Sequence, residues 1–546
     1  MVFAIGALCL YGGVQRWTGI TRTPEYDELY TLHIFASKSF SRIFSDVGTP
    51  NNHTLNTWCI KSLLPFFEGN EILALRLTSF LAGMGVLLLS LFAFFKIPPF
   101  RKSFAGGFFI ALTAFNGALI HYAQTGRGYS LQSFWVLCAA FSFLYLLKKQ
   151  ISTTEGILFV FFSLFASLSA CLSVSTGILY ITGIFLAGLL LLFFQYKEGK
   201  EDLKNFLLRK RYFFSAGILF GLLALSYYLP LAKEFMKGAG FGSRLDLSQE
   251  TMRHIWNIIK ENDLLIPLIF TFLALIFAKK GKKLILFFLL AGFFPLLTGF
   301  LFRSGPPRVY VPAIPLILAS GALGAGLLMK QWRKKTLLFA LFPILLAASL
   351  FSISPQIHER LRGDDLGVTF SFLGEKVPGN FYPVFMPTES FALEMLYGTN
   401  ALQEIAGRIP SAEGILLAGR GVGASDLKSG NSSVYVIPEK IPPEASFQLG
   451  GKTIWNLFPL EKISKEVKNH SLLFIFGARC AKEEMTFLSG KEKILNFRQN
   501  RLVNSDGKVD FVFVIPGKEA PFTLQEIRQW ERGSSGRLRF LVLQGE

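Results

Sequence analysis

The chain has 546 residues, of which 51% are hydrophobic and 15% are aromatic. These fractions exceed what a soluble core of this size uses, so they exclude an ordinary soluble globular protein. The formal net charge of +19 comes mainly from short Lys and Arg clusters between hydrophobic runs, which is the pattern of cytoplasmic loops and not of a groove for nucleic acid.

Long apolar runs recur through the first 353 residues. A helix of roughly 20 apolar residues crosses a bilayer, and on this basis we predict about eleven transmembrane helices. The first run is slightly short, but it lacks the basic start and the cleavage site of a signal peptide. The predicted spans are 2–14, 72–95, 104–120, 131–147, 157–173, 177–194, 213–231, 264–277, 284–301, 309–329 and 337–351.

The distribution of charge predicts the orientation of these spans. If the amino terminus is cytoplasmic, every dense basic cluster lies inside, as the positive-inside bias requires. Four polar segments then share the outer face: the first loop (about 18–70), HYAQTGRGYS, the loop that begins MKGAGFG, and FRSGPPR. An odd number of spans also places the region from residue 354 onward outside.

Residues 354–546 form a different kind of sequence. Hydrophobic runs shrink to strand length in SSVYVIPE, SLLFIFGA, VDFVFVIPG and RLRFLVLQ, and ESFALEMLYG is typical of a helix. We therefore expect a soluble α/β domain here, after a transmembrane domain of residues 1–353. The piece AGRGVGAS lacks the spacing of a nucleotide-binding loop and is interpreted as a plain turn.

Two adjacent acids, Asp27 and Glu28, lie in the first polar loop. Paired carboxylates at a water-exposed membrane face can act as a base, hold a metal ion or be solvated. Two carboxylates are an incomplete ligand set for a divalent metal, so a metal at Asp27 and Glu28 stays an alternative and no metal site is predicted. The five cysteines show no CxxC pair, which excludes a disulfide framework and a zinc site. A single bond between Cys59 and Cys480 stays an alternative to their packing as small hydrophobic residues.

Three arginines, Arg127, Arg303 and Arg308, occur in short outer turns, where the positive-inside bias disfavours them. A guanidinium group can bind a phosphate through two parallel hydrogen bonds. Snorkelling toward lipid headgroups is the alternative explanation. Tyr129 and Tyr310, each two residues beyond one of these arginines, are interpreted as interfacial aromatic residues.

The segment PNNHTLNTW contains Asn52 and His53. Both could contact a substrate, although a lone loop histidine is usually a polar surface residue. Arg76 lies about one turn inside the second span, where a charge is costly unless it is paired, and we expect a structural pairing with Asp27 or Glu28.

The order of these motifs resembles the GT-C glycosyltransferases, and within them the bacterial branch related to protein mannosyltransferases and aminoarabinose transferases. The motifs are the acidic pair, PNNHTLNTW, NEILALRLTS, TGRGYSL and PPRVYVPAIP. The resemblance implies a polyprenyl-phosphate sugar donor, inverting transfer, and the first-loop acid as catalytic residue. By motif position this acid is Asp27, with Glu28 beside it.

The same resemblance assigns Arg127 and Arg308 to the two arginine motifs, with Arg303, Tyr129 and Tyr310 nearby, and predicts that these residues bind the donor phosphate. The chain reads NNHT where the family more often has an HPP-type motif, so the role of His53 stays open. The expected location is a bacterial inner membrane.

The resulting prediction is an integral-membrane glycosyltransferase that acts on a lipid, glycan or protein acceptor among membrane lipids and needs no cofactor. A lipid or sugar transporter is the main alternative. The polar residues lie at the outer ends of the spans and no repeat is evident, which disfavours transport. A lipid-binding membrane scaffold is the third interpretation.

Overall fold

The computed structural model describes residues 2–21, 24, 26–46, 52–148, 151–199, 202–233, 249–278, 280–301 and 307–332, together with short strands between residues 382 and 542. The chain divides into two compact units. The first contains Met1–Arg22 and Tyr30–Arg362, and the second contains Thr23–Leu29 and Gly363–Glu546.

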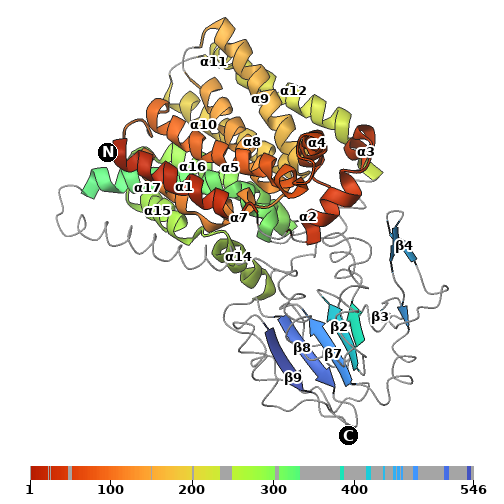
Figure 1. The fold of residues 1–546 in the computed structure, drawn as a ribbon. Helices are drawn as coiled ribbons and strands as arrows, with labels where there is room; N and C mark the ends of the chain where they lie inside the picture. The colour runs from red at the N-terminus through yellow and green to blue at the C-terminus, as the bar shows by residue number, and fades with distance from the viewer. Residues whose placement is uncertain are drawn as a thin grey trace. The chain divides into compact units, whose positions relative to one another are not determined.

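The first 332 residues are helical wherever they form regular structure (Figure 1). Short elements come early: α2 (Tyr26–Tyr30), the π-helix η1 (Thr31–Phe35), α3 (Phe40–Ser45), α4 (Thr54–Leu63) and the 3-10 helix η2 (Leu64–Phe66). The longer helices are α1 (Val2–Thr18), α5 (Glu71–Lys96), α6 (Phe104–Phe115), α8 (Gly128–Leu146), α9 (Thr153–Ser173), α10 (Gly177–Glu198), α12 (Arg211–Tyr228), α14 (Gln249–Glu261), α15 (Leu265–Phe277), α16 (Lys282–Leu301) and α17 (Ile314–Trp332). The connecting elements are α7 (Gly117–Ala123), α11 (Leu203–Arg209) and the 3-10 helix η3 (Pro307–Ala313).

Within the part of the chain that the structure describes, five helices are long and apolar enough to cross a membrane, or six if the bent pair of α6 and α7 is one span. Each predicted span up to residue 329 falls largely on helix, and the last, 337–351, lies outside the described residues. The chain is thus a multi-pass helical membrane protein, whereas a number of eleven spans is not established.

The predicted span 104–120 is not one continuous helix. Instead, α6 and α7 meet at an angle of 55°. Asn116 ends α6 with an extended backbone (ψ 116°) and its side chain accepts a hydrogen bond from the N–H of Leu119 at 2.9 Å. Asn116 is therefore the N-cap of a new helix, and capping competes with continuation of the old one.

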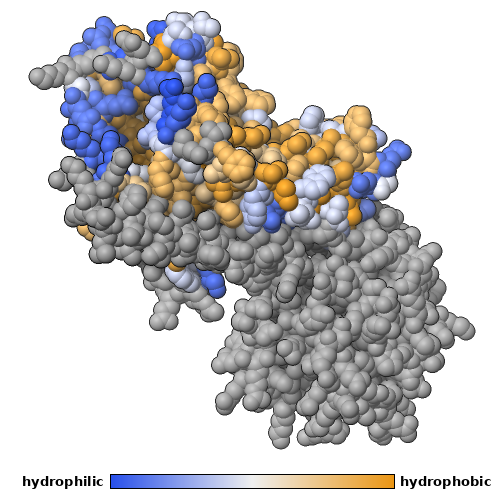
Figure 2. All heavy atoms as spheres, turned by 60° about the vertical axis from the view of Figure 1, so that its left-hand side comes forward, coloured by the Kyte–Doolittle hydropathy of each residue, from blue (hydrophilic) through white to orange (hydrophobic). Residues whose placement is uncertain are grey.

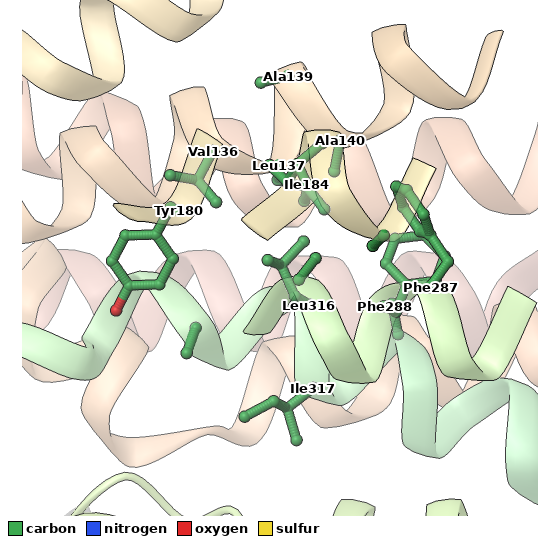
Figure 3. Close-up of a cluster of buried hydrophobic side chains, with 14 of the residues drawn as sticks. Val136, Leu137, Ala139, Ala140, Tyr180, Ile184, Phe287, Phe288, Leu316 and Ile317 are labelled. Carbon is green, nitrogen blue, oxygen red and sulfur yellow. The ribbon is translucent and has the colours of Figure 1, made fainter. Parts of the chain in front are cut away.

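The core of the helical unit lies where α8, α10, α16 and α17 cross. Figure 3 shows Val136 and Leu137 of α8, Ile184 of α10, Phe288 of α16 and Leu316 of α17 pointing toward one another. Small residues allow this approach, since Ala139 and Ala140 are fully buried between the helices. On the visible outer face, hydrophobic side chains cover much of the helical unit, as Figure 2 shows, which is the distribution expected of a surface in contact with lipid.

The polar segments are more ordered than the sequence suggested. The stretch Thr21–Trp58 was interpreted as a loop, but it contains α2, η1 and α3 and the start of α4. The predicted loop that begins MKGAGFG contains α14, which is an amphipathic helix with its polar and apolar residues on opposite faces. Within these short helices, backbone N–H and C=O groups form hydrogen bonds with one another, which an irregular loop would not provide.

The second unit contains a seven-stranded mixed sheet with the order β6-β3-β1-β2-β7-β8-β9 and a separate hairpin of β4 and β5. Strands β1, β2 and β7 pair in parallel, and so do β8 and β9, whereas β7 and β8 are antiparallel, with Phe474 opposite Phe513. Figure 1 shows β2, β7, β8 and β9 side by side. The strands are β1 (Tyr382–Phe385), β2 (Gly414–Gly419), β3 (Val434–Val436), β4 (Phe447–Leu449), β5 (Lys452–Ile454), β6 (Leu457–Phe458), β7 (Ser471–Phe476), β8 (Asp510–Ile515) and β9 (Leu538–Val542).

The four predicted strand segments of this region coincide with β3, β7, β8 and β9. The predicted helix in ESFALEMLYG lies outside the described residues, as does most of AGRGVGAS. The parallel pairs are typical of an α/β arrangement, and the α part stays a prediction.

Candidate functional site

His53 is the N-cap residue of α4 and lies inside the protein, with only 2% of its surface exposed. Its Nδ1 accepts a hydrogen bond from the backbone N–H of Gly128 at 2.6 Å, and its ring packs edge-on against Tyr129 with 4.9 Å between the ring centroids. The interpretation of His53 as a polar surface residue is therefore wrong. The first polar segment folds back onto the start of α8, a contact that no local sequence pattern encodes.

The TGRGYS turn joins α7 to α8 and is held by neighbours on several sides. The Asn56 amide donates to the carbonyl oxygen of Gly126 at 3.1 Å, and the Ser79 hydroxyl donates to the carbonyl oxygen of Arg127 at 2.8 Å. A Cβ at Gly128 would lie 2.5 Å from the carbonyl oxygen of Ser173 and 2.8 Å from the Cβ of His53. Only glycine permits this approach.

Arg127 is 4% exposed, and its guanidinium lies over the ring of Tyr129 at 5.6 Å from the centroid. An arginine that snorkels to lipid headgroups keeps its charged end in contact with the membrane surface. Burial within the protein contradicts that alternative for Arg127. The cation–π contact instead positions the guanidinium as part of an internal site.

Arg308 lies on η3, and this helix packs against α8. Hydrogen bonds on both sides hold η3 in place. The Tyr180 hydroxyl donates to the carbonyl oxygen of Val309 at 3.2 Å, and the Asn262 amide donates to that of Pro307 at 3.2 Å. The carbonyl oxygen of Asn262 in turn accepts from the Asn116 amide at 3.0 Å, so the bend between α6 and α7 supports η3 through one buried asparagine.

The charges of both arginines act on His53. Burial is the main cause that lowers the pKa of His53 well below its ordinary value of 6.5, and the positive charges of Arg127 and Arg308 lower it further. His53 is therefore neutral at pH 7. Buried His53 and Arg127 and half-buried Arg308 form one positively charged site, which we call the arginine site.

Of the predicted phosphate ligands, Arg127, Arg308 and Tyr129 are thus brought together, whereas Arg303 lies outside the described residues. Tyr310 is 3% exposed and packs with Ile258 and Leu296. Both tyrosines are buried, so their interpretation as interfacial aromatic residues is wrong. The TGRGYS turn that precedes Tyr129 looks like a surface turn in the sequence, but neighbouring helices cover it in the folded protein.

Asn52 has a structural role in addition to any contact with substrate. Its amide donates to the carbonyl oxygens of Ile43 at 2.9 Å and Asp46 at 2.7 Å, which ties the end of α3 to the start of α4. Arg76 is fully buried and donates to the carbonyl oxygen of Ile20 at 2.9 Å. This hydrogen bond gives Arg76 a structural role just after α1, and its pairing with Asp27 or Glu28 stays a prediction.

The acidic pair lies on α2, in the stretch Thr23–Leu29 that groups with the second unit. Asp27 is half-buried and Glu28 is completely buried. Among the described residues, no group of three His, Cys, Asp or Glu side chains is placed to hold a metal ion, and the alternative of a metal at these two acids gains no support. Cys59 is a free thiol.

No family model matches this sequence. No curated protein matches it either. Among solved structures, ArnT from Cupriavidus metallidurans in the apo state matches with a TM-score of 0.46 and 13% identity, over 87% of this chain and 92% of that one. The same protein bound to undecaprenyl phosphate matches with a TM-score of 0.44 and 12% identity, over 87% and 93%.

Proposed function

We propose that this protein is a membrane glycosyltransferase that moves a sugar from a polyprenyl-phosphate donor to a lipid, glycan or protein acceptor on the outer face of a bacterial inner membrane. The observation that carries the proposal is the arginine site. Arg127 and Arg308 converge on a neutral His53 in a multi-pass membrane protein. Two guanidinium groups beside a neutral imidazole give the site a positive charge that suits a phosphate, and a phosphate on a lipid can reach such a site from the bilayer.

The proposed reaction is an inverting displacement. The Asp27 carboxylate takes the proton of an acceptor hydroxyl while that oxygen forms a bond to the anomeric carbon. The bond between the anomeric carbon and the phosphate oxygen breaks, and the polyprenyl phosphate leaves with the electron pair. Arg127 and Arg308 stabilise the negative charge that accumulates on this phosphate, and they do so best in a site with little water.

The role of Asp27 rests on its place in the first polar segment and on its motif position. Asp27 is half-buried on α2, so its carboxylate is not fully enclosed by the protein. Glu28, which is completely buried, is proposed to orient α2 and not to contact the acceptor.

The test uses the purified full chain in lipid nanodiscs. Mass spectrometry of glycolipids and glycoproteins from cells with and without the gene first identifies the sugar and the acceptor. Release of polyprenyl phosphate from the matching donor is then measured. Movement of the lipid across a bilayer without release of polyprenyl phosphate would contradict the proposal and favour a transporter.

Asp27→Asn preserves the size of the side chain and removes the proton acceptor. We expect turnover to fall by roughly 10² to 10⁴, while donor binding and thermal stability change little. Glu28→Gln is the neighbouring comparison and should reduce thermal stability, because Glu28 is buried. Normal transfer by Asp27→Asn would exclude Asp27 as the base and make Glu28 the next candidate.

A further inference from the structure

The contact between His53 and Gly128 determines where the proton of the imidazole lies. His53 Nδ1 accepts the backbone N–H of Gly128 at 2.6 Å, and a nitrogen that accepts a hydrogen bond carries no proton. In the neutral ring the proton is therefore on Nε2. The edge-on contact with Tyr129 keeps the ring in this orientation, so Nε2–H points in one fixed direction.

Nε2 of His53 is buried, and no atom of the described residues hydrogen-bonds to it. Protein interiors seldom leave such a donor open, because it loses its water without gaining a partner. Two further buried atoms on the same face of α4 lack a hydrogen-bond partner among the described residues: Thr57 Oγ1, which can donate, and Asn56 Oδ1, which can only accept. Positions 53, 56 and 57 lie at i, i+3 and i+4, so this face of the helix is prepared for a polar ligand.

The charge around the site decides the chemistry of that ligand. Arg127 and Arg308 both act on His53 through their positive charge, which favours an anion and disfavours a cation. A neutral N–H donor adds a directed hydrogen bond without adding a third charge. Phosphate oxygens accept several such bonds at once.

We infer that His53 Nε2–H donates a hydrogen bond to a phosphate oxygen of the lipid-linked donor, so that His53 is a third phosphate ligand beside Arg127 and Arg308. This inference rests on the proposed function. The backbone N–H of Gly128 acts through His53 by holding the tautomer, and the glycine is required because a side chain there would displace the ring.

Two substitutions separate the two nitrogens. In His53→Asn, the side-chain oxygen occupies the place of Nδ1 and can still accept from Gly128, but nothing replaces Nε2–H. In His53→Gln, the longer amide can place an N–H near the position of Nε2. His121→Asn, which changes another histidine that lies on α7, is the matched control.

Binding of a polyprenyl phosphate without sugar is measured in nanodiscs. We expect His53→Asn to weaken binding about 10- to 100-fold, and His53→Gln to recover most of this loss. His121→Asn should bind as the wild type does. Polyprenol without phosphate should bind weakly and equally to all variants. Inorganic phosphate that bound as tightly as the lipid, with the same dependence on His53, would overturn the assignment to a lipid-linked phosphate.

Equal binding by the wild type and His53→Asn overturns the inference and leaves the proposed function standing. A wild type that binds no polyprenyl phosphate defeats the proposed function itself. If His53→Asn proves unstable, NMR of isotope-labelled histidine in the wild type decides. The Nε2–H signal of His53 should move when polyprenyl phosphate is added, and a signal that stays in place overturns the inference.

Discussion

Arg127 and Arg308 are expected to contribute to transfer far more than a surface arginine does. Arg127→Ala or Arg308→Ala should lower the transfer rate roughly tenfold to a thousandfold, because each removes a preorganised charge from the departing phosphate. Lysine at either position should restore only part of the rate, since it offers a point charge in place of a planar fork. Rates are measured as release of polyprenyl phosphate.

Arg209→Ala is the matched control for both variants. Arg209 is exposed and, like Arg127, lies over an aromatic ring, at 5.7 Å from the centroid of Phe206. It should lose little activity. If donor binding and turnover were unchanged in both Arg127→Ala and Arg308→Ala, the arginine site would have no role in phosphate binding.

The neutral state of His53 predicts how stability depends on pH. Its native pKa is lowered, mainly by burial and further by Arg127 and Arg308, whereas the unfolded chain titrates near 6.5. Below pH 6.5 the unfolded state therefore binds a proton that the native state does not, and stability falls as the pH falls. The slope is at most about 1.4 kcal/mol per pH unit for one proton. Above pH 6.5 the contribution is complete.

Thermal unfolding of the wild type and of His53→Asn at about pH 7 and about pH 5 tests this dependence. The wild type should lose more stability on acidification than the variant, which has no group to titrate at this position. Parallel losses in the two proteins would mean that His53 is not held neutral in the folded state.

At the scale of single residues, the sequence drew attention to Arg127 and Arg308 but did not predict the burial of His53. Arg127 and Arg308 could be found because a positive charge in an outer turn contradicts a general bias, and that contradiction is visible in the sequence. The burial of His53 depends on a hydrogen bond to a residue 75 positions away. Nothing in the segment PNNHTLNTW indicates that distant partner.

At the scale of single elements, we predict that the carboxyl end of α8 is stabilised by a buried lysine from another part of the chain, which lies between α11 and α12. Lys210 is 1% exposed, and its Nζ donates to the carbonyl oxygens of Leu147 at 2.6 Å and Lys148 at 2.7 Å. These groups follow the last turn of α8, where a cation also offsets the negative end of the helix dipole. Lys210→Met should therefore destabilise the protein by about 1 to 3 kcal/mol.

Thermal unfolding in detergent measures this effect, with Lys204→Met as the control. Lys204 belongs to the same basic segment but is exposed, so its replacement should change stability by less than about 0.5 kcal/mol. Equal stability of the two variants would show that the carbonyl groups at the end of α8 find other partners.

The apolar helices could be predicted from the hydrophobicity of their sequence. The same hydrophobicity does not show where an apolar helix is interrupted or where a short helix lies inside a polar segment. The bend at Asn116 has a local signal, since asparagine before glycine is typical of a cap, yet a hydropathy window averages over it. In the same way α14 has an amphipathic pattern inside a segment that is polar on average. Periodicity within polar segments would have identified it.

For the whole molecule, the strands of the second unit followed from the length of their hydrophobic runs, whereas the order of the sheet did not. Strand β2 pairs with β7 and not with its neighbours β3 to β6 along the chain. Pairing across such distances depends on side-chain packing between segments, which a single sequence does not reveal.

Membrane orientation is the last prediction. Asn70 and Lys102 are both exposed and lie beyond opposite ends of α5, a helix of 26 residues that is long enough to span a bilayer. In a variant without native cysteines, we expect Asn70→Cys and Ser433→Cys to react with an impermeant maleimide from the outer side. Lys102→Cys should react only after the membrane is breached, because positive charge concentrates on the cytoplasmic side.

The three positions together make this test decisive. Asn70 and Lys102 must differ, since α5 lies between them, and equal labelling of the two would contradict α5 as a span. Reversed labelling, with Lys102→Cys accessible and Asn70→Cys protected, would place the amino-terminal end of α5 in the cytoplasm. A protected Ser433→Cys beside an accessible Asn70→Cys would separate the second unit from the outer face, and the proposed transfer would then have to proceed without it.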